Sequence, residues 1–251
     1  MRAKARPRFY FSFRSPFSWM ASIRLEERIP DAPDLIDYIP YIDPDERTWE
    51  TLRARKVEMH YVQMSKAKHL YILQDTKRLS AARGLAMKWP IDRDPWWVLP
   101  HLAYLDAVQQ GSGRDLYWAL CAARWERGED ICTPEVLRAA AEQVGLDPDR
   151  AVAAPDDEAL RTIGADGLEK AYFDDVFGIP FFKVGRHKFW GLDRVDLFCD
   201  AVLESLGRPV EPVAPIPAPE TDDAADPLEG VPAEARELVG AYDADTAGGC
   251  G

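Results

Sequence analysis

Strand-forming segments stand near the start of this chain and again near residue 180, with a long helical stretch between them. Residues 8–13 predict a first strand, and residues 16–28 predict a first helix. Residues 34–42 predict a second strand. Pro40 has no backbone N–H, so this strand is expected at an edge of its sheet or at its exit. The chain therefore begins as a β-α-β unit.

The helical stretch covers residues 45–172, where apolar residues recur at spacings of three and four. Strand signals return at residues 178–184 and 188–190, and the Gly185 turn between them predicts a hairpin. Residues 192–206 predict an amphipathic helix that closes the fold.

In this order, one small sheet is built from two separate parts of the chain. We expect an α/β domain made of residues 1–44 and 173–207, with residues 45–172 forming a helical insertion domain. Residues 208–251 are rich in proline and acidic side chains, so we expect a disordered tail with a short helix inside residues 232–242.

The net charge of −12 excludes some classes of partner. Residues 208–251 hold ten acidic and two basic residues, so the body of the chain is only mildly acidic. Nucleic acids and anionic membranes both need a positive surface, and we expect the chain to bind neither. No apolar run of about 18 residues could span a bilayer. A cytoplasmic enzyme with a small-molecule substrate is the expectation, and a homodimer is left open.

The four cysteines, Cys121, Cys132, Cys199 and Cys250, form no CxxC pair and have no histidines at the spacing of a zinc site. We therefore predict no metal centre. The first three are expected to act as buried apolar side chains.

The start of the first helix reads Ser15-Pro16-Phe17-Ser18. Serine is a common N-cap and proline a common first helical residue, so this turn alone is an ordinary helix start. This turn directly follows a predicted strand, and a Gly-Ile-Pro turn precedes the later hairpin. The two turns in this order are more specific than either one alone.

Taken together, FYFSFRSPFSW and the downstream VFGIPFFKVGRHKFWGLDR resemble the DsbA-like branch of the thioredoxin superfamily. Within that branch the chain looks most like the group of 2-hydroxychromene-2-carboxylate isomerases and kappa-class glutathione transferases. Further matches lie at Lys68, Tyr71, Asp75 and Arg78. The resemblance implies a thioredoxin-like fold with a large all-helical insertion.

In disulfide oxidoreductases of this superfamily the residue before the proline is the attacking cysteine. Here that residue is Ser15, and the resolving position is Ser18. A hydroxyl cannot exchange disulfides, so the turn cannot act as a disulfide oxidoreductase. Ser15 can instead donate a hydrogen bond to a thiolate from another molecule, and the resemblance implies glutathione or a similar small thiol.

The resemblance also implies the rest of a glutathione site. Pro180 is expected to be cis, with the backbone of Ile179 pairing with the cysteinyl part of the thiol. Asp193 is expected to take the α-ammonium group. The predicted cofactor-binding residues are Phe17, Ser18, Ile179, Pro180, Asp193 and Arg194.

Substrate contacts are harder to assign, because the usual lysine and asparagine of the isomerase group have no match near residues 43–56. Arg47, Trp49 and Arg53 are candidates for an anionic substrate, with a solvated helix face as the alternative. Further candidates are Tyr71, Trp97 and His101. For Trp97 and His101 the alternative is a place in the core.

The first functional hypothesis is an isomerase of an unsaturated carbonyl or aromatic metabolite that uses reversible thiol addition at Ser15. The second hypothesis is a glutathione transferase, in which the added thiol stays attached to the product. A third hypothesis is a thiol-independent isomerase or tailoring enzyme of an unsaturated acyl metabolite. A fourth is a redox-inactive peptide-binding protein whose acidic tail docks a partner. A variant of the first hypothesis makes Cys250 a tethered thiol that visits Ser15 in place of glutathione. The alternative is a mobile, exposed cysteine with no role.

Overall fold

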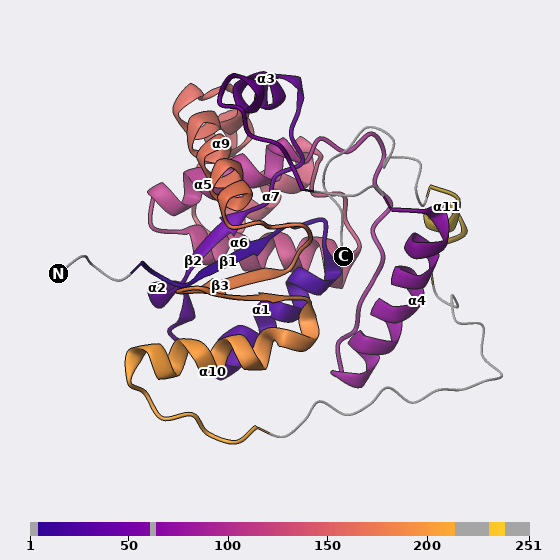
Figure 1. The fold of residues 1–251 in the computed structure, drawn as a ribbon. Coiled ribbons are helices and arrows are strands. Elements are labelled where there is room, and N and C mark those ends of the chain that lie inside the picture. The colour runs from indigo at the N-terminus through magenta and orange to yellow at the C-terminus, as the bar shows by residue number, and fades with distance from the viewer. Residues whose placement is uncertain (1–4, 61–63, 214–230, 239–251) are drawn as a thin grey trace.

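The computed structural model describes residues 5–60, 64–213 and 231–238 (Figure 1). Its centre is a four-stranded mixed sheet in the order β2-β1-β3-β4. The strands are β1 (Arg8–Phe11), β2 (Asp37–Pro40), β3 (Phe181–Val184) and β4 (His187–Trp190). β1 runs parallel to β2 and antiparallel to β3, so segments about 170 residues apart share one sheet.

Aromatic side chains hold the centre of the sheet together. Phe9 on β1 stands opposite Phe182 on β3, and the two rings stack with their centroids 4.9 Å apart. Phe182 also stacks on Phe198 of the closing helix at 4.8 Å. β2 is an edge strand and ends at Pro40, which confirms the prediction drawn from this proline.

The helices cover both faces of the sheet. Their bounds are α1 (Pro16–Arg28), α2 (Ala32–Leu35), α3 (Glu46–Ala54), α4 (Lys66–Ala82), α5 (Val98–Gln109), α6 (Gly113–Cys121), α7 (Pro134–Gln143), α8 (Pro148–Ala153), α9 (Glu158–Phe173), α10 (Val195–Leu206) and α11 (Ala233–Leu238). A π-helix, η1 (Ala122–Arg127), continues α6, and two short 3₁₀ helices are η2 (Ala154–Asp156) and η3 (Leu192–Arg194).

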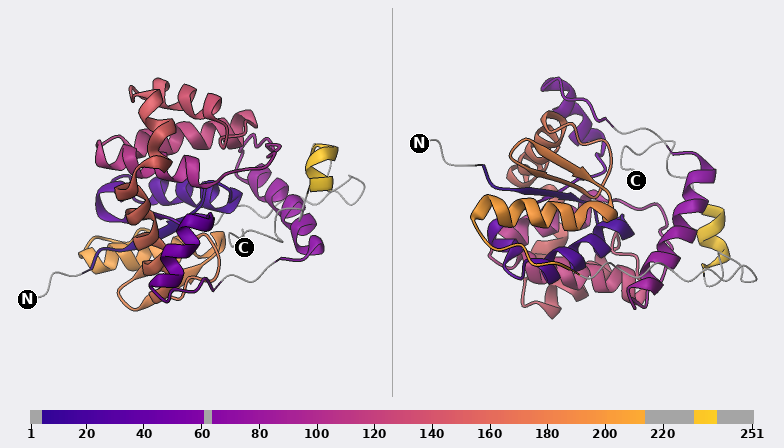
Figure 2. Two further views of the ribbon diagram at one scale, coloured as in Figure 1. Left: turned by 90° about the horizontal axis from the view of Figure 1, so that it is seen from above. Right: turned by 60° about the horizontal axis from the view of Figure 1, so that its bottom comes forward.

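Helices α1 and α10 pack together beneath the sheet, and α9 of the insertion lies above it in the view of Figure 1. Helix α4 stands at one end of the molecule with α11 beside it in both views of Figure 2. This is the expected thioredoxin-like arrangement, with a long helical insertion between β2 and β3.

Several predicted boundaries were wrong. The first strand ends at Phe11 and the second at Pro40, two residues earlier than predicted in each case. The second strand begins at Asp37, because Pro33 occupies an early position of α2 and the chain is helical over Ala32–Leu35. The strand predicted at residues 178–184 begins at Phe181, after the Ile179–Pro180 turn. The closing helix starts as the 3₁₀ helix η3 and becomes α-helical at Val195.

The predicted short helix in the tail corresponds to α11, which contacts the body. Val231 before it is buried, and Glu234 pairs with Arg93 at 2.6 Å. Residues 214–230 and 239–251, including Cys250, lie outside the described residues. The division of the chain into domains stays a prediction.

The remaining cysteines agree with their prediction in part. Cys121 and Cys199 are buried, and burial raises the pKa of Cys199 to about 12. Cys132 is only half-buried. Across residues 5–60, 64–213 and 231–238, no group of acidic, histidine or cysteine side chains could hold a metal ion. Among the same residues no helix has the length and hydropathy of a membrane span.

Candidate active site

The serine turn joins the end of β1 to the start of α1. Ser15 is the N-cap of the helix, in an extended conformation with φ −92° and ψ 115°. Its Oγ accepts a hydrogen bond from the backbone N–H of Ser18 at 3.2 Å. Its own N–H donates to the carbonyl of Ser12 at 3.1 Å, which closes the turn. The local sequence explains this geometry, because Pro16 occupies the first helical position, where no N–H is needed.

The electrostatics of this helix start favour an anion. The first turn of α1 contains no acidic residue, and the free N–H groups of a helix start carry a partial positive charge. Ser15 and Ser18 are both buried, at 0% and 1% exposure. The bond from Ser18 uses the oxygen of Ser15 as acceptor, which leaves the hydroxyl proton to be donated.

The Ile179–Pro180 turn directly precedes β3, at the same end of the sheet as the serine turn. Its peptide bond is cis, and Ile179 is 1% exposed. Tyr10 pairs with Phe181 in the antiparallel ladder, so the next residues outward bring Pro180 opposite Phe11, just before the serine turn. The register thus places the two turns identified in the sequence at the same end of the neighbouring strands β1 and β3.

The third predicted segment joins them at Gly191. The N–H of Gly191 donates to the carbonyl of Pro180 at 3.0 Å, and η3 packs against α1. Gly191 has φ +93°, and a Cβ atom there would lie 2.9 Å from the carboxylate of Asp193. Asp193 and Arg194 are exposed and pair with each other at 2.5 Å. Both charges face solvent.

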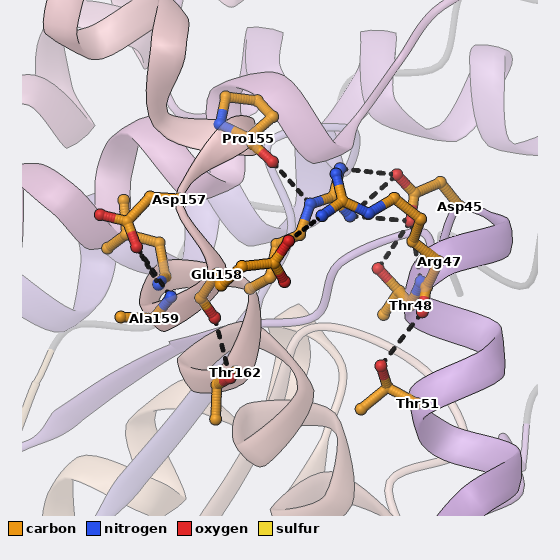
Figure 3. A network of polar contacts seen from close by, with 11 residues as sticks. Asp45, Arg47, Thr48, Thr51, Pro155, Asp157, Glu158, Ala159 and Thr162 are labelled. Atoms are coloured by element: carbon orange, nitrogen blue, oxygen red, sulfur yellow. Dashed lines mark hydrogen bonds and ion pairs between the residues drawn. The ribbon is translucent and has the colours of Figure 1, made fainter.

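The two candidate arginines on α3, Arg47 and Arg53, are already paired with carboxylates. Arg47 pairs with Glu158 of α9 (Figure 3). Arg53 pairs with Glu46, two turns before it on α3, at 2.9 Å. All four side chains are largely exposed. Trp49 is partly buried and packs against the core. This arrangement favours a solvated helix face with surface ion pairs over a set of substrate contacts.

Two further candidates lie in contrasting environments. Tyr71 on α4 is 55% exposed, and the guanidinium of Arg78 lies 5.8 Å from its ring centroid. Trp97 is 2% exposed, with the guanidinium of Arg124 at 4.6 Å from its ring. Trp97 is therefore a core residue.

The buried Arg124 is a feature that sequence reasoning missed. It lies on η1 between the rings of Trp97 and Trp125 and makes two hydrogen bonds to Asp92, at 2.7 and 2.8 Å. A π-helix does not follow from residue spacing, so no sequence signal marked this arginine as buried.

His101 is also fully buried, but it touches the site. Its Nε2 lies 3.2 Å from the backbone nitrogen of Phe13 and 3.3 Å from the hydroxyl of Ser12. The sequence indicated His101 as a pocket residue or a core residue, and neither description includes this contact with the serine turn.

Comparison with known proteins fits this geometry. A family model described as the DSBA-like thioredoxin domain matches residues 8–203. The chain belongs to the DSBA-like thioredoxin family. This confirms the resemblance seen in the sequence and the fold expected from it.

Individual relatives of this DSBA-like protein include an isomerase. The 2-hydroxychromene-2-carboxylate isomerase of Sphingobium xenophagum is 27% identical over 206 residues, which cover 78% of this chain and 97% of the relative. A solved 2-hydroxychromene-2-carboxylate isomerase superposes with a TM-score of 0.61 at 21% identity, covering 80% of this chain and 95% of that one. A probable DsbA oxidoreductase from Streptomyces coelicolor gives 0.57 at 17% identity, with 87% and 97% covered. The two structures show the fold alone.

Proposed function

We propose that this DSBA-like protein is an isomerase of an unsaturated carbonyl or aromatic small molecule, and that it works with a glutathione-type thiol. The observation that carries the proposal is Ser15, a hydroxyl at the helix start where a thioredoxin-type oxidoreductase holds its attacking sulfur. The similarity to a curated isomerase over most of both chains supports an isomerase of the DsbA-like group.

The residues at the site fit a thiol. The Ser15 proton is available to donate, and the first turn of α1 has no carboxylate. The Ile179–Pro180 turn lies at the same end of the sheet as the serine turn. Bound glutathione would supply a nucleophilic sulfur, whose addition and later loss allow a carbon–carbon double bond to rotate with no net change of atoms or electrons.

Each part of the chain has a defined task in this proposal. Ser15 donates a hydrogen bond to the thiolate, and the partial positive charge at the start of α1 adds to its stabilisation. The backbone of Ile179 aligns the cysteinyl part, with Phe17 and Ser18 forming the adjoining wall. Asp193 and Arg194 hold the charged end of the thiol, which requires their mutual ion pair to open.

Burial of Ser15 strengthens this stabilisation. A hydrogen bond to a charged acceptor is worth more where water is excluded. Ser15 has no exposed surface, so the groups that cover it must move aside for the thiol to reach its hydroxyl. Removing one donor of this kind commonly lowers catalytic rates by about 10²–10³. We expect a loss of that size when the hydroxyl is removed.

The test is an isomerase assay with a 2-hydroxychromene-2-carboxylate-type substrate, run with and without glutathione. We expect turnover only with the thiol present, and an isomer as the product. Turnover without any thiol would contradict the role given to glutathione. A product that keeps the thiol attached would favour a transferase.

A further inference from the structure

The imidazole of His101 connects the helical insertion to the serine turn. His101 lies on α5, is fully buried, and reaches residues 88 and 89 positions earlier in the chain. The rings of Phe11, Phe13 and Trp97 surround it, with centroids 5.1 to 6.4 Å away. A polar ring in such a place must satisfy its hydrogen bonds internally.

The hydrogen bonds fix which nitrogen carries the proton. Nδ1 lies 2.7 Å from the carbonyl oxygen of Trp97, which can only accept, so Nδ1 is the protonated nitrogen. Nε2 then offers its lone pair and accepts from the N–H of Phe13 at 3.2 Å. The neutral ring thus donates a hydrogen bond to Trp97, the N-cap residue of α5, and accepts one from the serine turn.

The turn depends on side chains because it belongs to neither β1 nor α1. The N–H of Phe13 bonds to His101, and the N–H of Arg14 bonds to the hydroxyl of Ser12 at 3.2 Å. The N–H of Ser12 bonds to Ser18 Oγ at 3.4 Å. Without His101 the buried N–H of Phe13 would lose its acceptor, and an unpaired buried donor makes the local conformation unfavourable.

We infer that His101 is a positioning residue, which holds the backbone at Ser12 and Phe13 so that the Ser15 hydroxyl is aimed at the bound thiolate. This inference rests on the proposed function. It gives the helical insertion a role in shaping the site, because α5 supplies the acceptor that the turn lacks.

Two variants of the full chain separate positioning from bulk packing. His101→Gln can place an amide oxygen near the position of Nε2, whereas His101→Leu fills similar volume and offers no acceptor. Leu99→Ala is the matched control, since Leu99 is also buried on α5 and its apolar side chain can give the turn no hydrogen bond. The measurements are kcat, the pH dependence of the bound thiolate's ultraviolet absorbance, and hydrogen exchange of the Phe13 amide.

We expect His101→Leu to lower kcat by about tenfold or more and to shift the thiolate titration to higher pH. We expect His101→Gln to stay within about threefold of the wild-type rate. Leu99→Ala should leave the titration unchanged even where it lowers the melting temperature as much as His101→Leu does. Exchange of the Phe13 amide should accelerate in His101→Leu and stay slow in the control.

The outcomes distinguish this inference from the function beneath it. If wild-type protein shows no thiolate signal with glutathione, the proposed function fails, and the exchange of the Phe13 amide still reports on His101. If the Phe13 amide stays protected in His101→Leu, or if His101→Leu titrates like the wild type, His101 does not position the turn.

Discussion

The side-chain oxygen of Ser15 accepts a hydrogen bond from the backbone N–H of Ser18 at 3.2 Å, so one hydroxyl both caps α1 and keeps a proton to donate. Removing it therefore has two separable effects. Ser15→Ala should lower the free energy of unfolding by about 1 kcal/mol through loss of the cap. It should also lower kcat by about 10²–10³ through loss of the donor.

Ser15→Thr is the control for this pair of effects, since it keeps both cap and hydroxyl. Denaturant unfolding and steady-state kinetics on the two variants measure the effects separately. If Ser15→Ala lost only stability, the hydroxyl would be a cap and nothing more.

A second prediction tests the helix start without any added thiol. Ser15→Cys places a sulfur where α1 begins, and burial alone would raise its pKa above the usual value of about 8.5. We expect the helix N-terminus to outweigh burial and to hold the pKa below about 7, as at comparable helix starts. The rate of alkylation by iodoacetamide as a function of pH gives this value. A pKa at or above about 8.5 would show that the site does not stabilise thiolates.

A third prediction concerns pH and His101. Burial, followed by the charge of Arg124, lowers the pKa of His101 to about 4, whereas the unfolded chain should titrate near 6.5. The unfolded state therefore binds more protons between these values, and stability should fall as pH drops from about 6.5 toward 4. The full difference is on the order of 3 kcal/mol.

His101→Gln removes this contribution while the other titrating groups remain. Urea unfolding of both proteins at about pH 7 and about pH 4.5 measures it as the difference between their pH dependences. Equal dependences would mean that His101 is protonated as easily in the folded chain as in the unfolded one.

The arginines of α3 provide a fourth prediction. Arg47 and Arg53 form exposed ion pairs, so replacing either with alanine should change stability by less than about 1 kcal/mol. The KM for substrate should also stay within about twofold. A tenfold rise in KM would show instead that these cations contact an anionic substrate. Arg161→Ala is the comparison for stability. Arg161 is 10% exposed and bonds to Asp45 and to the carbonyl of Pro155, so its loss should lower the free energy of unfolding more than the loss of Arg47 or Arg53 does.

The terminal cysteine gives the fifth prediction. Cys250→Ser should leave the glutathione-dependent rate unchanged, because the proposed thiol comes from solution. Activity assays of the full chain with and without glutathione measure this. Thiol-independent activity that disappears in Cys250→Ser would support the tethered thiol instead.

Much of the fold could be predicted because its strands and turns are marked by local residues. Pro40 placed β2 at an edge, and Gly185 placed the hairpin turn. The serine turn and the Ile179–Pro180 turn could be expected to meet because a resemblance linked them, while no local pattern relates residues so far apart in the chain. The pairing of Tyr10 with Phe181 places both turns at the same end of β1 and β3.

The parts of the site that could not be predicted depend on side-chain packing between distant helices. His101 sits in an apolar helix, VLPHLAYL, where spacing alone indicates a core position. Its bond to Phe13 requires the path of α5 past the end of β1. In the same way, no residue spacing marks Arg124 as buried. Its burial depends on the π-helix η1 and on the rings of Trp97 and Trp125.

The position of the glutathione sulfur, in crystals of the full chain soaked with the reduced thiol, tests the role of Ser15 most directly. We predict the sulfur within hydrogen-bond distance of Ser15 Oγ, with the cysteinyl backbone paired to Ile179. Glutathione bound elsewhere, or its sulfur turned away from Ser15, would contradict that role.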